Sequence, residues 1–382
     1  MPLLVVAVVV VTVGLVVSAQ AKNYYLFAPG TAPRLTASAT CSGPSELKLP
    51  GGAPCARIDV PPSLTHPVSG RLLMVDINVG PATGVEYLLD KVGLLSRLDR
   101  GYQLVPAQAY TGGQTPRQVQ CADTAQMTGA QQDAPVAALR RLGYRVSEVD
   151  RGAAVAQVSP GTPAAGAGLE CNDVITGIDG HIVRTAQDLI DALHGLPAGQ
   201  KVSVTAMAPG TDGKVVTRTV DATLTTTPPD VAKATGRPAS TGFLGVGTTT
   251  DVSYRMPFAV SIDAGNIGGP SAGLAFALGV IDLVSGGHLT GDHTVAATGQ
   301  IDPNGNVLDV GGVAQKAIAV ERAGATAFIV PSAEVGAAQS SVGNKVKVYG
   351  VTTLDQALAD LSAMGGTVPA ANFAASHPAP PA

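Results

Sequence analysis

A glycine-rich turn between an apolar strand and an apolar helix constrains this chain more than any other segment. Residues 262–273 read Ile-Asp-Ala-Gly-Asn-Ile-Gly-Gly-Pro-Ser-Ala-Gly, after a β-type run at 258–262 and before an apolar helical run at 274–284. Proline is favoured at the first helical position, so the pattern predicts that the helix starts at Pro270, with Gly269 as its cap. Ser271 then lies in the first turn and is not needed as a cap.

This position of Ser271 has a chemical and a plain interpretation. Free amides and the positive end of a helix dipole can stabilise a developing oxyanion, which an acyl-transfer nucleophile needs. The plain interpretation is a small residue in a crowded turn. Gly-rich turns of this kind also bind phosphate, so the stretch alone leaves the choice open.

A nucleophilic serine needs a base, and lysine fits this sequence better than histidine. None of the six histidines lies in a recognisable Ser-His-Asp signature. Residues 307–324 predict a strand, a Gly-Gly turn and a helix ending at Gly324, with Lys316 on its apolar face and Gln315 and Arg322 facing away. Burial would lower the pKa of Lys316 towards neutrality, whereas a snorkelling lysine would keep its charge in water.

Several blocks of the sequence, taken in order, closely resemble the proteolytic domain of the Lon family. They lie at 266–273, 297–302, 305–307, 311–316, 323–325 and 328–331. The resemblance covers residues 242–362 and is closest to the membrane-anchored, PDZ-containing bacterial branch that lacks an ATPase.

The resemblance implies a Ser-Lys dyad, with Ser271 as the nucleophile and Lys316 as the general base. It also implies that Thr298 helps to hold the lysine amine, and that amides around Gly269, Pro270 and Ser271 form the oxyanion hole. Lon proteases with an attached ATPase usually carry an acidic residue where this chain has Gly269, a departure that affects substrate range rather than the dyad.

Residues 134–225 are similar to a bacterial PDZ domain, with a helix expected at 185–193. Asn172 stands where such domains usually have glycine, and asparagine tolerates the left-handed turn required there. We expect the peptide groove between this helix and the strand that starts at 142–146, with exposed amides near Gly143 capturing a terminal carboxylate. The groove residues would be Leu142, Gly143, Tyr144 and Arg145, although a plain core strand explains them equally well.

The fold class expected is α/β and multi-domain, with a membrane anchor, a small α/β region, a PDZ domain and a Lon-type α+β proteolytic domain. The expected boundaries are an anchor at 1–21, an extracytoplasmic α/β region at 22–133, the PDZ domain at 134–225, a linker at 226–241, the proteolytic domain at 242–362 and a disordered tail at 363–382. The region at 22–133 is interpreted as a spacer or partner surface.

An uncharged apolar run at the N-terminus indicates export. Residues 3–19 suit either the core of a signal peptide or a short membrane span, and Ala19-Gln-Ala21 resembles a cleavage site. The family resemblance favours an uncleaved, single-pass anchor in the cell membrane, with the catalytic region outside the cytoplasm.

Cysteine content agrees with an oxidising compartment. Cys41, Cys55, Cys121 and Cys171 allow three disulfide pairings, and the sequence does not choose among them. No cluster predicts a metal, no cofactor is expected, and a net charge of −4 gives no electrostatic argument for nucleic acid.

These features predict an ATP-independent serine endopeptidase that cleaves exported or membrane-proximal polypeptides and binds peptide tails through its PDZ domain. The sequence has no Gly-x-x-x-x-Gly-Lys-Ser/Thr motif, so substrates should be loose, already unfolded or accessible at a terminus. Homo-oligomer formation is left open. The alternatives are a non-catalytic PDZ scaffold and a protein that processes only itself.

Overall fold

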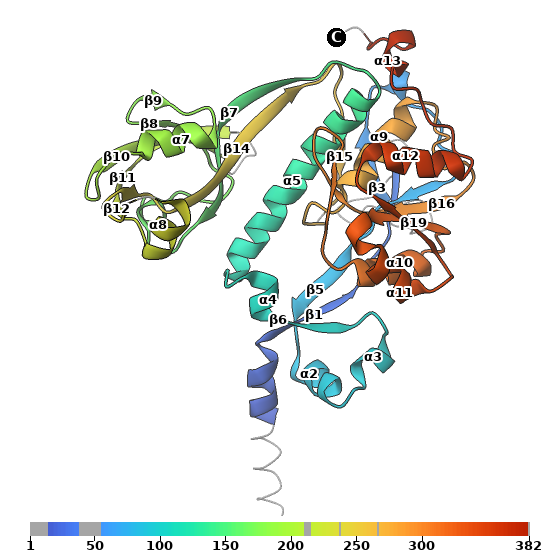
Figure 1. Cartoon of the computed structure of the whole chain (residues 1–382), viewed down its shortest axis with the longest axis horizontal. Helices are drawn as coiled ribbons and strands as arrows, with labels where there is room; N and C mark the ends of the chain where they lie inside the picture. The colour runs from blue at the N-terminus through green and yellow to red at the C-terminus, as the bar shows by residue number, and fades with distance from the viewer. Residues whose placement is uncertain (1–13, 38–54, 210–214, 237, 266, 381–382) are drawn as a thin grey trace, which may run out of the picture. The chain divides into compact units, whose positions relative to one another are not determined.

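The computed structural model describes residues 14–37, 55–209, 215–236, 238–265 and 267–380. The chain divides into two compact units (Figure 1). The first unit comprises residues 1–115, 126–146 and 256–382, and the second comprises residues 116–125 and 147–255. Helix α5 (Pro116–Arg141) is shared between them, because its first ten residues belong to the second unit.

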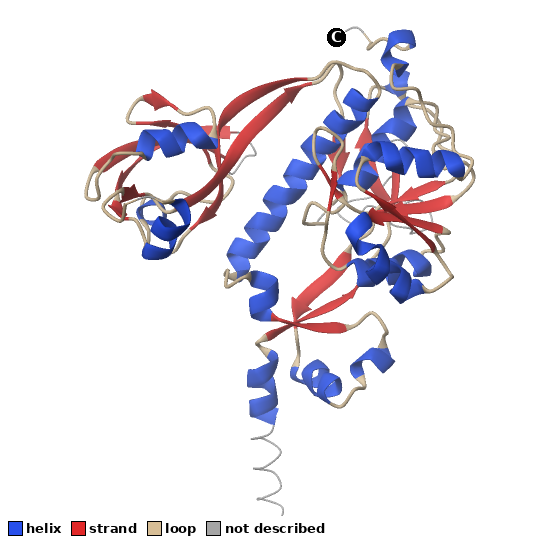
Figure 2. Ribbon diagram, viewed as in Figure 1, coloured by secondary structure: helices blue, strands red, loops and turns tan. Residues whose placement is uncertain are grey.

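The first unit is built on a seven-stranded mixed sheet, drawn as red arrows in Figure 2. Its strand order is β15 (Ser261–Asp263), β3 (Cys55–Asp59), β2 (Arg34–Ala37), β4 (Arg71–Leu73), β16 (Thr294–Ala297), β19 (Ala327–Pro331) and β20 (Lys347–Val351). The four strands from β4 to β20 are parallel neighbours. The carboxyl ends of these strands therefore meet at one edge, where functional residues collect in such sheets.

The sheet has an apolar core on each face because successive side chains of a strand point to opposite sides. Leu72 and Met74 belong to the core that includes helices α9 (Gly273–Val284) and α12 (Leu354–Ala363). Leu73 and Val75 belong to the opposite core, with α10 (Val313–Arg322) and α11 (Val335–Val342). Every residue of α9 is buried, which explains why its sequence is apolar apart from Asp282.

The N-terminal region is not the separate domain that the sequence predicted. Strands β2, β3 and β4 complete the sheet of the first unit, and β15 pairs with β3. A second, three-stranded sheet in this unit contains β5 (Ile77–Pro81), β1 (Tyr24–Pro29) and β6 (Gln103–Pro106), near the short helices α2 (Gly84–Lys91), α3 (Leu95–Leu98) and α4 (Ala107–Thr111). The pairings of β15 with β3 and of β16 with β4 join strands more than 200 residues apart, and period-two patterns carry no information about such partners.

The C-terminal segment differs from the disordered tail expected at 363–382. Through residue 380 it is described, and it contains helix α13 (Phe373–Ser376). Phe373 contacts the core of the first unit, and the Ala374 amide donates to the carbonyl of Leu142. This segment is ordered because its apolar residues, which lie among the prolines and alanines, pack against the core of the first unit.

At the N-terminus, residues 14–21 form a helix that leads into β1, while residues 1–13 lie outside the described part. Among the described residues, none of the helices combines the length and apolarity that crossing a membrane requires. Most of the apolar run at 3–19, which predicted a membrane anchor, lies outside the described residues.

The second unit has the PDZ architecture expected for residues 134–225, with different limits. Its sheet has the order β11 (Val215–Thr223), β10 (Lys201–Pro209), β8 (Val174–Ile178), β7 (Ser147–Val158) and β14 (Val246–Arg255), and β9 (His181–Ile182) also pairs with β8. Helix α7 (Ala186–Leu193) starts at a capping box formed by Thr185 and Asp188. Asn172 has a φ of +70°, which confirms the predicted left-handed turn.

The segment at 226–241, expected to be a plain linker, is structured within the second unit. It holds the short helix α8 (Pro229–Thr235), and the strands β12 (Thr225–Thr226) and β13 (Gly242–Phe243) pair around it. The PDZ unit then continues through β14, so that its end lies at Arg255 rather than at the predicted residue 225.

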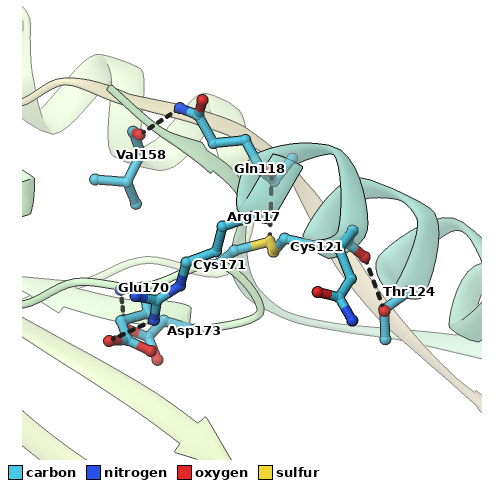
Figure 3. The surroundings of a disulfide bond; sticks show 10 residues. Arg117, Gln118, Cys121, Thr124, Val158, Glu170, Cys171 and Asp173 are labelled. Carbon is cyan, nitrogen blue, oxygen red and sulfur yellow. Dashed lines mark hydrogen bonds and ion pairs between the residues drawn. A yellow bond between two sulfur atoms is a disulfide. The ribbon is translucent and has the colours of Figure 1, made fainter. Parts of the chain in front are cut away.

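A disulfide bond joins Cys121 of α5 to Cys171 in the loop before β8 (Figure 3). Nearby, the Gln118 side chain donates to the carbonyl of Val158, and Arg117 forms an ion pair with Glu170. This pairing is one of the three that the sequence allowed. The side chains of Cys41 and Cys55 lie outside the described part of the structure.

Candidate active site

Ser271 lies at the end of the glycine-rich turn that joins β15 to α9, but it is not within the helix. The prediction that the helix starts at Pro270 is wrong, because α9 begins at Gly273 with Ala272 as its cap. The physical reason is a long-range contact. The Ser271 carbonyl accepts hydrogen bonds from the Gly299 amide at 2.8 Å and the Thr298 hydroxyl at 3.0 Å, instead of an amide of the next helical turn.

Thr298 connects the serine segment to the predicted base. It follows β16 at the carboxyl edge of the parallel strands and is fully buried. The Lys316 amine donates to the Thr298 hydroxyl at 3.3 Å. A threonine hydroxyl has one proton, and this proton is donated to the Ser271 carbonyl, so Thr298 must accept from Lys316. One hydroxyl therefore holds both the backbone of Ser271 and the amine of Lys316.

Lys316 is buried, with only 2% of its surface exposed. Burial lowers its pKa from 10.5 to about 8, because the charged amine loses its hydration, while the charges of Glu334 and Asp76 act in the opposite direction. A substantial fraction of the amine is thus neutral near physiological pH. The snorkelling alternative is excluded, since that geometry would leave the amine in water.

Helix α10 is more buried than its pattern suggested. Gln315, expected to face away from the core, is only 4% exposed, and its side-chain amide donates to Gln103 of β6 at 3.1 Å. Strands of the second, three-stranded sheet cover this side of α10, and no local pattern predicts such a cover. Arg322 does face outward, where it pairs with Asp99.

The Ser271 side chain is partly exposed, and its hydroxyl has no hydrogen-bond partner among the described residues. The hydroxyl is thus free to turn towards a substrate or towards the amine. Catalytic hydrogen bonds often tighten only when substrate binds, so an open geometry is compatible with a nucleophile.

The oxyanion hole expected around residues 269–271 can have only two amide donors from these three residues. Pro270 has no N–H, so the donors of this turn are the amides of Gly269 and Ser271. Gly269 has a φ of +83°, and among the described residues other than its chain neighbours no atom lies within 4 Å of the place where a side chain would start. Open space therefore lies on that side of the Gly269 backbone.

The residues predicted to line the PDZ groove, 142–145, belong to the first unit and not to the PDZ unit. Leu142 and Tyr144 are buried in the core of the first unit, and the Tyr144 hydroxyl donates to the carbonyl of His377. The expectation of exposed amides near Gly143 is wrong, because the Gly143 amide donates to the carbonyl of Arg140. Arg145 is exposed and precedes β7.

Strand β14 lies at one edge of the PDZ sheet, and the sequence analysis missed it. It pairs antiparallel with β7 along its whole length and also contacts α7. The Ala186 amide, at the start of α7, donates to the Thr250 hydroxyl of β14. A second Leu-Gly pair, Leu244-Gly245, precedes β14, and Gly245 has a φ of +91°. The Leu-Gly pair at 244–245 was the sequence signal that could have located the groove beside β14.

The site contains a partly exposed serine at a glycine-rich turn and a buried, partly neutral lysine. These are the components of a serine hydrolase site in which lysine takes the place of histidine. Comparison with known proteins agrees with this class. Residues 247–363 match the model of the Lon protease (S16) C-terminal proteolytic domain, and residues 141–221 match the model of the PDZ domain.

Individual Lon proteases are also similar to this chain. The chain is 32% identical to Lon protease 1 of Sorangium cellulosum over 34% of its own length and 17% of that protein. It is 32% identical to Lon protease 2 of Bacillus subtilis over 29% of this chain and 19% of the relative. The match to Lon protease of Clostridioides difficile is 37% over 29% of this chain and 14% of the relative.

The matched region thus spans less than a fifth of each of these Lon proteases. The chain contains a PDZ domain and a Lon-type proteolytic domain, and the latter is a serine peptidase domain.

Proposed function

We propose that this protein is an ATP-independent serine endopeptidase that uses Ser271 as its nucleophile and Lys316 as its general base. The observation that carries the proposal is the buried Lys316 amine, which donates to the hydroxyl that also holds the Ser271 backbone. A lysine whose pKa is lowered to about 8 is a competent base at neutral pH.

In the proposed reaction, the neutral amine of Lys316 accepts the proton of the Ser271 hydroxyl as the serine oxygen attacks a peptide carbonyl. The amides of Gly269 and Ser271 donate to the oxyanion that forms. The protonated lysine then gives its proton to the leaving amine, and an acyl-enzyme remains. Water, deprotonated by the same lysine, then attacks the acyl ester. The ester bond breaks, the second product leaves as a carboxylic acid, and the lysine returns its proton to the Ser271 oxygen.

Independence from ATP is supported by the absence of a phosphate-binding loop motif from these 382 residues. ATP-driven unfolding through a motif of this type is therefore not available within these residues. We therefore propose that its substrates are unfolded polypeptides or accessible chain ends.

We propose that the PDZ domain binds peptide tails at the free edge of β14, beside α7, and not at residues 142–145. An extended tail would add antiparallel to β14, with its carboxylate near the turn at Gly245. Ile190 of α7 is 42% exposed and would supply apolar contact to the last side chains of the tail.

The proposed location is outside the cytoplasm at the cell membrane, and the proposed substrates are exported or membrane-proximal polypeptides. The disulfide between Cys121 and Cys171 supports an oxidising compartment. The apolar run at 3–19 supports export, as a signal peptide or an anchor.

The test compares the wild-type chain with Ser271→Ala and Lys316→Ala on unfolded casein. We expect cleavage by the wild type and loss of at least 1,000-fold in both variants, as for groups that act as one catalytic unit. Lys345→Ala, on the surface, is the matched control. If the wild type cuts only its own chain, the protein is a self-processing one, and if neither casein nor its own chain is cut, it is a PDZ scaffold.

A further inference from the structure

Glu334 contacts the turn from which the lysine helix starts. It is the last residue of a short 3-10 helix, Ser332–Glu334, that follows β19, and it is half-buried. One oxygen of its carboxylate accepts a hydrogen bond from the Val310 amide at 2.8 Å. Val310 immediately precedes the Gly311-Gly312 turn, and the Gly312 carbonyl accepts the amide of Lys316. Glu334 thereby fixes the backbone that leads to Lys316.

The second carboxylate oxygen of Glu334 is buried and, within the described residues, has no hydrogen-bond partner. A buried carboxylate oxygen without a partner costs free energy unless a positive charge compensates it. The positive charge that acts on Glu334 is that of Lys316, while Asp309 acts on it as a like charge. Burial is the largest effect and raises the pKa of Glu334.

Asp76 is the other acidic group that acts on Lys316, but its carboxylate has partners of its own. The Thr31 hydroxyl donates to it at 2.8 Å, and the Thr31 amide donates to its other oxygen. Hydrogen bonds of this kind spread the negative charge over the donors. Glu334 has one carboxylate oxygen without a hydrogen-bond partner among the described residues. Its negative charge is therefore less compensated by hydrogen bonds than that of Asp76.

Resting on the proposed Ser271–Lys316 dyad, we propose that Glu334 is a positioning residue of the active site. One carboxylate oxygen fixes the turn that starts the lysine helix, and the other provides the negative charge that balances the lysine amine. The balance keeps the amine protonatable despite its burial, so that it can accept the serine proton and return it to the leaving group.

The two roles separate in the variant Glu334→Gln. Glutamine keeps the carbonyl oxygen that accepts the Val310 amide, but it removes the charge. The pKa of Lys316 should then fall, and more of the amine should be neutral at a given pH. The acidic limb of kcat/KM, which rises as the lysine loses its proton, should move to lower pH by about 0.5–1 unit, a conservative figure for one charge in a partly buried site.

Two further variants make the result specific. Glu321→Gln is the matched control, because Glu321 lies on the outer face of the same helix and pairs with Arg100 and Lys345. Its pH profile should equal that of the wild type. Glu334→Ala removes the hydrogen bond as well as the charge, and should lower kcat with little change in KM.

A second readout does not depend on turnover. The rate at which a fluorophosphonate labels Ser271 should show the same shift of its acidic limb in Glu334→Gln. Unchanged limbs in both measurements, with Lys316→Ala inactive, would overturn the role of Glu334 and leave the dyad standing. Full activity in Lys316→Ala would instead refute the proposed function itself.

Discussion

The Thr298 hydroxyl accepts a hydrogen bond from the Lys316 amine at 3.3 Å, in a part of the fold where both side chains are buried. The same hydroxyl donates to the Ser271 carbonyl. Without this hydroxyl, the buried amine should lose its hydrogen-bond partner. The Ser271 carbonyl should lose one of the two hydrogen bonds that it accepts. We predict that Thr298→Val lowers kcat/KM by about 10- to 100-fold, in line with the loss of a buried hydrogen bond to a charged group.

Thr298→Ser is the control for that prediction, because serine retains the hydroxyl. It should keep most of the wild-type kcat/KM. Wild-type kcat/KM in Thr298→Val would show that the site does not require the hydroxyl, and a loss confined to Thr298→Ser would assign the requirement to the methyl group.

The buried lysine should make the protein less stable at neutral pH than it is at alkaline pH. Its pKa is about 8 in the folded chain against 10.5 for a free side chain, so the unfolded chain binds more protons between these values. Stability should therefore rise as pH increases from about 8 to 10.5. The full cost, about 3 kcal/mol, applies below pH 8.

Lys316→Met removes this cost, and chemical unfolding at pH 7 should show a gain of about 3 kcal/mol over the wild type. The gain should shrink towards pH 10.5. Lys347→Met, at an exposed position of β20, should change stability little. A less stable Lys316→Met chain at pH 7 would contradict the electrostatic account.

Asp282 of α9 should behave in the opposite sense. It is 2% exposed, and burial raises its pKa from 3.8 to about 6. The folded chain then holds the proton longer, so its stability falls as pH increases from about 4 to 6. We predict that Asp282→Asn, which can still accept the Leu289 amide, stabilises the protein at pH 7 by up to about 3 kcal/mol.

Unfolding curves of Asp282→Asn and the wild type should converge by pH 4. If the asparagine variant is the less stable one at pH 7, the carboxylate must be charged and favourably paired in the folded state.

Tail binding at β14 is tested with a fluorescent peptide that ends in an apolar residue. Ile190→Asp should weaken its binding to the full chain at least tenfold, because it puts a charge beside the peptide's last side chains. Ile182→Asp, at an exposed apolar residue of β9, is the matched control. An amidated peptide should bind more weakly than a free carboxylate. Weakening by Arg145→Ala alone would restore the earlier placement of the groove.

Residues 126–146 of the first unit lie in the loop of 50 residues that the disulfide between Cys121 and Cys171 closes, although both cysteines belong to the second unit. Replacing both cysteines with serine should destabilise this unit by about 4 kcal/mol, from the chain entropy that the crosslink removes from the unfolded state. The first unit contains neither cysteine but part of the loop, so its transition should shift less than that of the second unit. An equal shift of both transitions would show that the two units unfold together.

The parts of the fold that the sequence predicted are those determined by local patterns. The buried stripe of α10, the left-handed turn at Asn172 and the apolar helix at 274–284 all follow from neighbouring residues. The start of α9 could not be predicted this way, because the Ser271 carbonyl bonds to residues 27 and 28 positions later. Glu334 was missed for the same reason, since it reaches the lysine helix from another element.

The PDZ groove was misplaced because two similar Leu-Gly segments precede strands of the PDZ sheet. Leu142-Gly143 precedes β7 and Leu244-Gly245 precedes β14, and only the sheet order identifies the second as the edge strand. Likewise, β2, β3 and β4 have strand-like sequences with no mark of the sheet that they join. Partner choice depends on tertiary packing, which period-two patterns do not encode.

The central claim, that Ser271 is the nucleophile activated by Lys316, is tested most directly by mass spectrometry of the full chain incubated with an unfolded polypeptide. The account predicts new peptide termini with the wild type, and a mass increase on Ser271 when the acyl-enzyme is trapped by acid. Ser271→Ala and Lys316→Ala should produce neither. Cleavage by Ser271→Ala at the wild-type rate would contradict the account.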